Sequence, residues 1–109
     1  MINSKDLKLL DKNYFDIIAT STYYVVLRSK NTGHLWHLLE RDLNGHKSLV
    51  ISHSHHASSP YHLQTNKPSI EACCEYIKNH DVYQLRKNQE RKERVLWRRE
   101  QKKLEAQQH

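Results

Sequence analysis

The chain has 109 residues and a formal net charge of +6, and its length fits one domain of ordinary size. Hydrophobic residues make up 37% of it, below the ~45–50% of typical globular domains, so we expect a small core and a segment that does not join it. The sequence contains no P-loop, dinucleotide-binding fingerprint or paired Cys-x-x-Cys zinc motif.

The apolar runs and the cysteines indicate where the chain resides. The longest apolar run, residues 23–27, is far shorter than the ~20 residues of a membrane span, so we expect no membrane partner. The two cysteines, Cys73 and Cys74, are adjacent, which is not the pattern of a disulfide framework. We therefore expect a cytoplasmic protein, with both thiols in the core as small hydrophobic groups.

The first part of the chain favours strands. Residues 1–13 are polar with a short apolar cluster, which is compatible with a short helix. Residues 14–28 are rich in Ile, Val, Thr and Tyr, which favour strands, and Ser21-Thr22 interrupts the segment as a bend or a tight turn. We expect further strands at residues 34–41, 47–53 and 61–64.

A hairpin turn is predicted between the second and third of these segments. Asn44-Gly45 separates two strand-like runs, and both residue types tolerate the positive φ of a type I′ turn. The sequence therefore predicts an antiparallel sheet of three or four strands.

One packed helix follows, at about residues 69–79. Ser69 is a suitable N-cap and Glu71 favours the positive end of the helix dipole. The apolar side chains of this helix recur at the spacing of one helical face and are Ile70, Cys73, Cys74 and Ile77. We expect this helix to pack on the sheet and to end at residues 79–81. The fold class is α+β, with a domain at residues 1–81 and a basic helical arm at residues 82–109.

The arm carries the net charge of the protein. Residues 86–103 contain nine basic and three acidic residues, a net charge of +6, so the rest of the chain is neutral. The arm lacks Gly and Pro and has no apolar residue from Arg86 to Arg94, so we expect a helix that projects from the core. Spacings of 4, 3, 4 and 4 place one row of basic residues along one side: Lys87, Arg91, Arg94, Arg98 and Lys102.

Histidines and aromatic residues are the remaining candidates. His53 and His55 are two residues apart on a strand, so they share a face and are candidate zinc ligands, although no zinc motif accompanies them. Trp97 lies among charges and is a candidate for stacking on a base. The other aromatic residues are expected to form the core: Tyr14, Phe15, Tyr23, Tyr24, Trp36, Tyr61, Tyr76 and Tyr83.

These features favour a non-enzymatic protein that binds DNA or RNA through phosphate contacts of its basic helix. The expected contact residues are Lys87, Arg91, Arg94, Trp97, Arg98, Arg99 and Lys102. The alternative is a small basic interaction module or inhibitor that docks on an acidic or nucleic-acid-binding protein through its sheet face or its C-terminal helix. Neither function requires a cofactor, and a homodimer is compatible with both.

Overall fold

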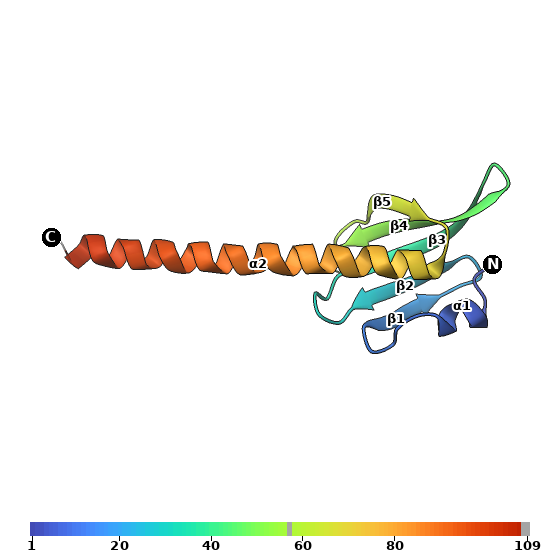
Figure 1. The fold of residues 1–109 in the computed structure, drawn as a ribbon, viewed down its shortest axis with the longest axis horizontal. Coiled ribbons are helices and arrows are strands. Elements are labelled where there is room, and N and C mark those ends of the chain that lie inside the picture. Colours follow the sequence, from blue (N-terminus) through green and yellow to red (C-terminus); the bar gives the residue numbers. More distant parts are fainter. Residues whose placement is uncertain (57, 108–109) are drawn as a thin grey trace.

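The computed structural model shows a five-stranded antiparallel sheet and two helices, an α+β architecture (Figure 1). It describes residues 1–56 and 58–107, so Ala57 in the loop before the last strand and the last two residues of the predicted arm lie outside the described residues. The elements in chain order are α1 (Ser4–Lys8), β1 (Phe15–Thr20), β2 (Tyr24–Ser29), β3 (Leu35–Leu43), β4 (His46–Ser54), β5 (His62–Lys67) and α2 (Ile70–Gln107).

The sheet has five strands rather than the three or four expected, because the segment at residues 14–28 forms two. The backbone N–H of Ser21 donates to the carbonyl of Tyr24 at 2.9 Å, which closes a tight turn between β1 and β2. Of the two alternatives predicted at Ser21-Thr22, a bend or a tight turn, the structure has the tight turn. Consecutive strands are neighbours throughout the sheet, in the order β1-β2-β3-β4-β5.

The β3–β4 hairpin forms where Asn44-Gly45 predicted it. Both residues have positive φ, 54° for Asn44 and 82° for Gly45, as that turn requires. Leu43 pairs with His46, and the register continues without a shift to Leu35 and Ser54. This uninterrupted pairing sends alternate side chains of both strands to opposite faces of the sheet.

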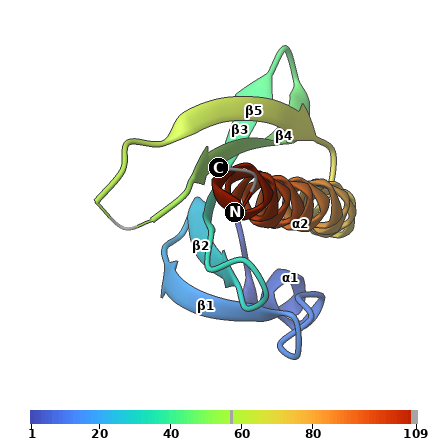
Figure 2. The same cartoon turned by 90° about the vertical axis from the view of Figure 1, so that its left-hand side faces the viewer.

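One face of the sheet holds the core, and we call it the inner face. Figure 2 shows α1 and α2 on the same side of the curved sheet. The inner face contributes the fully buried side chains Val25, Leu27, Trp36, Leu38 and Ile51. α1 is capped by Asn3, whose side chain accepts from the backbone N–H of Asp6, and nearby Ile2 and Leu7 pack against the same core.

α2 begins as predicted but does not end where the sequence suggested. The hydroxyl of Ser69 accepts from the backbone N–H of Ala72 at 3.1 Å, and Ile70, Cys73, Cys74 and Ile77 are buried in the core cluster. The expected end at residues 79–81 is wrong, since α2 runs on as one helix of 38 residues. Within the described residues, no helix is both long and apolar enough to cross a membrane.

Candidate functional site

The second part of α2 extends away from the sheet as a free helix, and we call residues 82–107 the arm (Figure 1). At 1.5 Å per residue these 26 residues extend about 39 Å. The molecule accordingly measures 70 × 29 × 24 Å. No residue of the arm is buried, in contrast to Asp81 immediately before it, so the arm is accessible to a ligand from every side.

The basic residues of the arm occupy one half of its circumference, which we call the basic half. An α-helix turns about 100° per residue, so residues 18 positions apart point in the same direction. Val95 therefore continues the direction of Ile77, which faces the sheet. Residues 86–103 contain nine basic residues, and eight of them lie within about 100° of that direction: Lys87, Arg91, Lys92, Arg94, Arg98, Arg99, Lys102 and Lys103. Arg86 is the exception.

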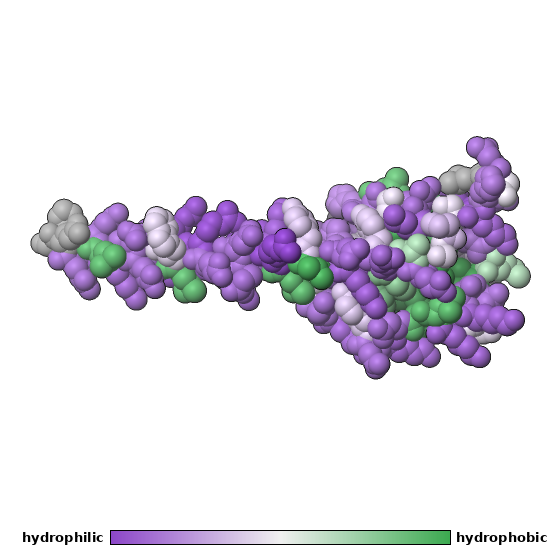
Figure 3. Space-filling model, viewed as in Figure 1, coloured by the Kyte–Doolittle hydropathy of each residue, from purple (hydrophilic) through white to green (hydrophobic). Residues whose placement is uncertain are grey.

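The opposite half of the arm carries Trp97 and three of the four acidic residues of the arm, whereas Glu105 lies about 80° from the direction of Ile77, on the basic half. Trp97 is 61% exposed and points about 160° away from the direction of Ile77. Glu90, Glu93 and Glu100 lie within about 60° of Trp97 around the helix. The helix thus brings six of the seven predicted contact residues to one half and places Trp97 outside it. Figure 3 shows the arm as hydrophilic along its length, with isolated hydrophobic residues.

The cations of the arm are not neutralised by the protein. Among the described residues, every ion pair joins groups of the sheet, of the N-terminal segment or of the packed part of α2, such as Arg28 with Asp16 at 3.0 Å. In residues 1–56 and 58–107, no carboxylate lies within ion-pair distance of a basic side chain from Arg86 to Lys103. The positive field of the basic half is therefore available to an external anion.

A buried carboxylate holds the root of the arm. Asp81 is fully buried and accepts from the Tyr14 hydroxyl at 2.6 Å and from the Thr32 hydroxyl at 3.3 Å. Burial and the hydrogen bond to Asp81 raise the pKa of Tyr14 to about 12, so this hydroxyl remains a donor at neutral pH. These bonds tie α2 to the residue before β1 and to the β2–β3 loop at the point where the helix leaves the sheet.

Four histidines gather beside this root, and we call them the histidine cluster: His34, His53, His55 and His80. Nδ1 of His34 lies 2.9 Å from Nε2 of His53, and the His53 ring stacks on Trp36 with centroids 4.1 Å apart. Burial, aided by the neighbouring imidazoles, lowers the pKa of His53 to about 3, and burial also lowers the pKa of His34 and of His80. The rings of His34, His53 and His80 are therefore packed as neutral groups at pH 7.

The candidate zinc ligands do not form a metal site. His53 and His55 share a face as predicted, with ring centroids 5.0 Å apart. Within the described part of the chain, however, no group of three or more His, Cys, Asp or Glu residues is arranged to hold a metal ion. Two observations account for this: the Nε2 of His53 is engaged by His34, and the thiols of Cys73 and Cys74 are buried in the core. Burial raises the pKa of these thiols, to about 12 and about 11 respectively.

Three of the aromatic residues assigned to the core are exposed instead. Tyr23, Tyr61 and Tyr83 are 55%, 42% and 53% exposed. Tyr61 immediately precedes edge strand β5, and Tyr83 lies on the arm, where the Nζ of Lys87 is 5.1 Å from its ring centroid. The polar residues around them were the available signal that these positions face solvent.

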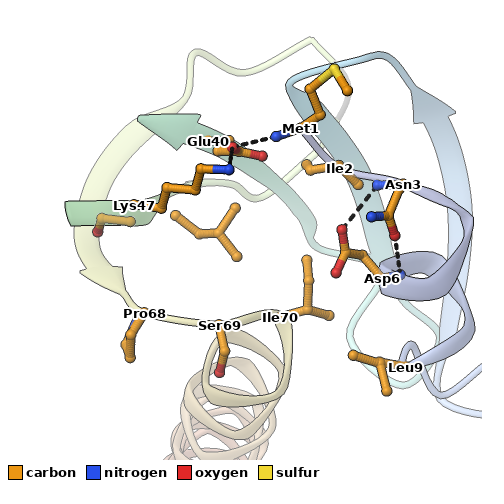
Figure 4. A pocket seen from close by; sticks show the side chains of 12 residues that line it. Met1, Ile2, Asn3, Asp6, Leu9, Glu40, Lys47, Pro68, Ser69 and Ile70 are labelled. Atoms are coloured by element: carbon orange, nitrogen blue, oxygen red, sulfur yellow. Dashed lines mark hydrogen bonds and ion pairs between the residues drawn. The ribbon is translucent and has the colours of Figure 1, made fainter. Parts of the chain in front are cut away.

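A pocket of about 330 Å³ lies at the opposite end of α2 from the arm (Figure 4). The segment before α1, the β3–β4 hairpin and the start of α2 surround it. Its charged groups pair with one another: Glu40 contacts the Met1 ammonium group and Lys47, and Asp6 accepts from the backbone of Asn3. The arm, with its unpaired cations, is therefore the stronger candidate for a binding site.

Comparison with protein-family models, with curated proteins and with solved structures finds no match to this chain.

Proposed function

We propose that the protein binds nucleic acid through the basic half of the arm, without catalysing a reaction. The observation that carries the proposal is the concentration of unpaired cations on one side of a fully exposed helix. Cations that neutralise phosphates release condensed counterions, and this release supplies most sequence-independent affinity. The row from Lys87 to Lys102 extends about 22 Å, enough to follow several successive phosphates of a strand.

The packed part of α2 supports this function by fixing the direction of the arm. Ile77 and Asp81 are fully buried, and residues 70–107 form one helix, so the arm is a continuation of an anchored element. A rigid row of cations loses less conformational entropy on binding than a flexible tail of the same charge. We therefore assign the phosphate contacts to Lys87, Arg91, Arg94, Arg98, Arg99 and Lys102.

The test is fluorescence anisotropy with duplex DNA, duplex RNA and single strands, each over a series of salt concentrations. For the wild-type protein, log K should fall by about 3 to 5 per decade of salt with a duplex. The variant Arg91→Gln, Arg98→Gln, Lys102→Gln should lower this slope by about 2 to 3, because each lost phosphate contact lowers it by about 1.

The matched control removes the same charge from the end of the molecule opposite the arm. Lys5 and Lys8 of α1 and Lys47 of the β3–β4 hairpin are exposed, and both elements lie at that end (Figure 1), so Lys5→Gln, Lys8→Gln, Lys47→Gln should leave the slope near its wild-type value. An equal decrease of the salt slope in both variants would show that binding depends on net charge alone and not on the arm. Absence of binding to every probe at low salt would overturn the proposal.

The opposite half of the arm favours a second candidate, docking on a protein. Trp97 and Leu104 are 61% and 52% exposed on this half and are anchors of the kind that helix-in-groove recognition uses. Trp97→Ala should then abolish capture of a protein partner while leaving the salt slope for duplex DNA unchanged. Weaker binding to the nucleic-acid probes at an unchanged salt slope would instead place Trp97 in the nucleic-acid contact.

A further inference from the structure

The face of the sheet opposite the core, the outer face, is not covered by either helix (Figure 2). Its side chains alternate with the buried ones along β2, β3 and β4, and Val26, Leu39 and Val50 are among them. These aliphatic groups are half-buried by their neighbours alone, and Leu63 on β5 is 73% exposed. The exposed face of an antiparallel sheet is usually polar, so the apolar side chains on this face indicate an interaction site.

Three aromatic rings form a row across the outer face. The ring centroids of Tyr24 and His37 are 5.2 Å apart, and those of His37 and Tyr61 are 5.9 Å apart. Ser52 of β4 is paired with His37 and lies between His37 and Tyr61. Its small side chain leaves room for the His37 ring to approach the Tyr61 ring, which comes from the other side of β4. Burial lowers the pKa of His37, so its ring is neutral and suited to stacking on a planar group.

The charge on the outer face is suited to an anionic ligand. Arg28 pairs with Leu35, and Arg41 lies further along the same face of β3, so both arginines flank the aromatic row. Asp16 on β1 is the nearby acidic group, and it already forms ion pairs with Arg28 at 3.0 Å and with Lys30 at 3.8 Å. Arg41 is exposed and remains available to a phosphate.

The outer face and the basic half of the arm look in the same direction. The side of α2 that faces the sheet is the side that becomes basic beyond Asp81, as Ile77 and Val95 show. A ligand that lies against the outer face and extends past the end of the sheet therefore meets the basic half of the arm. The basic half lies further back than the outer face, because the sheet itself separates the outer face from α2. An extended single strand, with bases on one side and phosphates on the other, matches this pair of surfaces.

We propose that the outer face stacks the unpaired bases of a single-stranded nucleic acid whose continuation contacts the basic half of the arm. Tyr24, His37 and Tyr61 are the stacking residues, and Arg41 contacts the phosphate backbone beside them. This inference rests on the proposed function and adds the substrate class to it: single strands are preferred to duplexes, because the bases of a duplex are not free to stack on the sheet.

The experiment compares an oligothymidylate with a duplex of the same length by fluorescence anisotropy at fixed salt. Tyr24→Leu, Tyr61→Leu should weaken single-strand binding by about tenfold or more, since each stacked base contributes about 1–3 kcal/mol. Duplex binding should not change. The control, Tyr23→Leu, removes an exposed tyrosine that belongs neither to the aromatic row nor to the arm, and it should leave both affinities unchanged.

A second variant keeps the test decisive if Tyr24→Leu impairs folding. Leu63→Glu changes a 73% exposed side chain, so the fold tolerates it, and the new carboxylate should repel phosphates and weaken single-strand binding alone. Equal affinity for both probes, with inert tyrosine and Leu63 variants, would overturn this inference and leave the role of the arm intact. Failure to bind any probe would overturn both. A dimer that Leu63→Glu dissociates in sedimentation would assign the outer face to a second copy instead.

Discussion

The two parts of α2 are the same helix in two different environments. From Ile70 to Asp81 the helix buries five side chains against the sheet, whereas the arm buries none. The first part contains Asn79, His80 and Asp81, which are weak helix formers, and the second is rich in Gln, Glu, Lys and Arg, which are strong ones. Tertiary contacts therefore hold the first part and intrinsic propensity the second, so the arm is free to devote its surface to binding.

The largest effect is expected from one of two matched substitutions to alanine within α2, one in each part of the helix. Ile77→Ala should lower the free energy of unfolding by about 2–5 kcal/mol, because Ile77 is fully buried in the core. Leu96→Ala removes a 57% exposed side chain and should change it by less than about 0.5 kcal/mol. Urea unfolding followed by circular dichroism measures both values. Equal losses would show that the arm packs on something after all.

Acidification should destabilise the packed region. The pKa of His53 is lowered to about 3 in the fold, against about 6.5 in an unfolded chain, so the unfolded state binds more protons between these values. The stability that this group contributes is fully present above pH 6.5 and is lost progressively as the pH falls toward 3. His34 and His80 add losses of the same sign.

Thermal unfolding over this pH range is the measurement. His53→Leu removes the titrating group and should flatten the dependence, whereas His46→Gln, at an exposed histidine in the β3–β4 hairpin, should leave it as in the wild type. A wild-type melting temperature that is constant from pH 7 to pH 4 would contradict the neutral packing of the cluster.

A smaller effect is expected where α2 leaves the sheet. Tyr14→Phe removes the 2.6 Å hydrogen bond to the buried carboxylate of Asp81 and should lower the free energy of unfolding by about 1–3 kcal/mol. Tyr83→Phe removes an exposed hydroxyl of the arm and should have no measurable effect. Chemical denaturation measures the free energy of unfolding of both variants. Equal values would show that Tyr14 does not anchor the arm.

The smallest effect concerns the arm alone. Glu90 lies one helical turn before Arg94, but the two side chains do not form an ion pair, so Glu90→Gln should lower helix stability by no more than a few tenths of a kcal/mol. The same substitution adds one unit of net positive charge, so it should raise affinity for the nucleic-acid probes at low salt. Anisotropy and circular dichroism on one preparation measure the two opposite changes, and a weaker affinity would place Glu90 in the contact.

Local chemistry determined much of the fold without help from the rest of the molecule. Runs of strand-favouring residues placed the strands, Asn44-Gly45 placed the hairpin, and Ser69 with the stripe through Ile77 placed the start of the packed helix. The segregation of charge at residues 86–103 also follows from the sequence, because helical periodicity needs only residue spacing. These features depend on neighbours within a few positions of one another.

Only the tertiary structure decided the features that join distant segments. Residues 79–81 have the composition of a helix end, yet Tyr14 and Thr32 give Asp81 hydrogen-bond partners, and the helix continues. The row of Tyr24, His37 and Tyr61 likewise exists only because the register of four strands brings the three rings to one face. Long-range pairing supplies these contacts, and no local pattern in the chain encodes which distant side chains will meet.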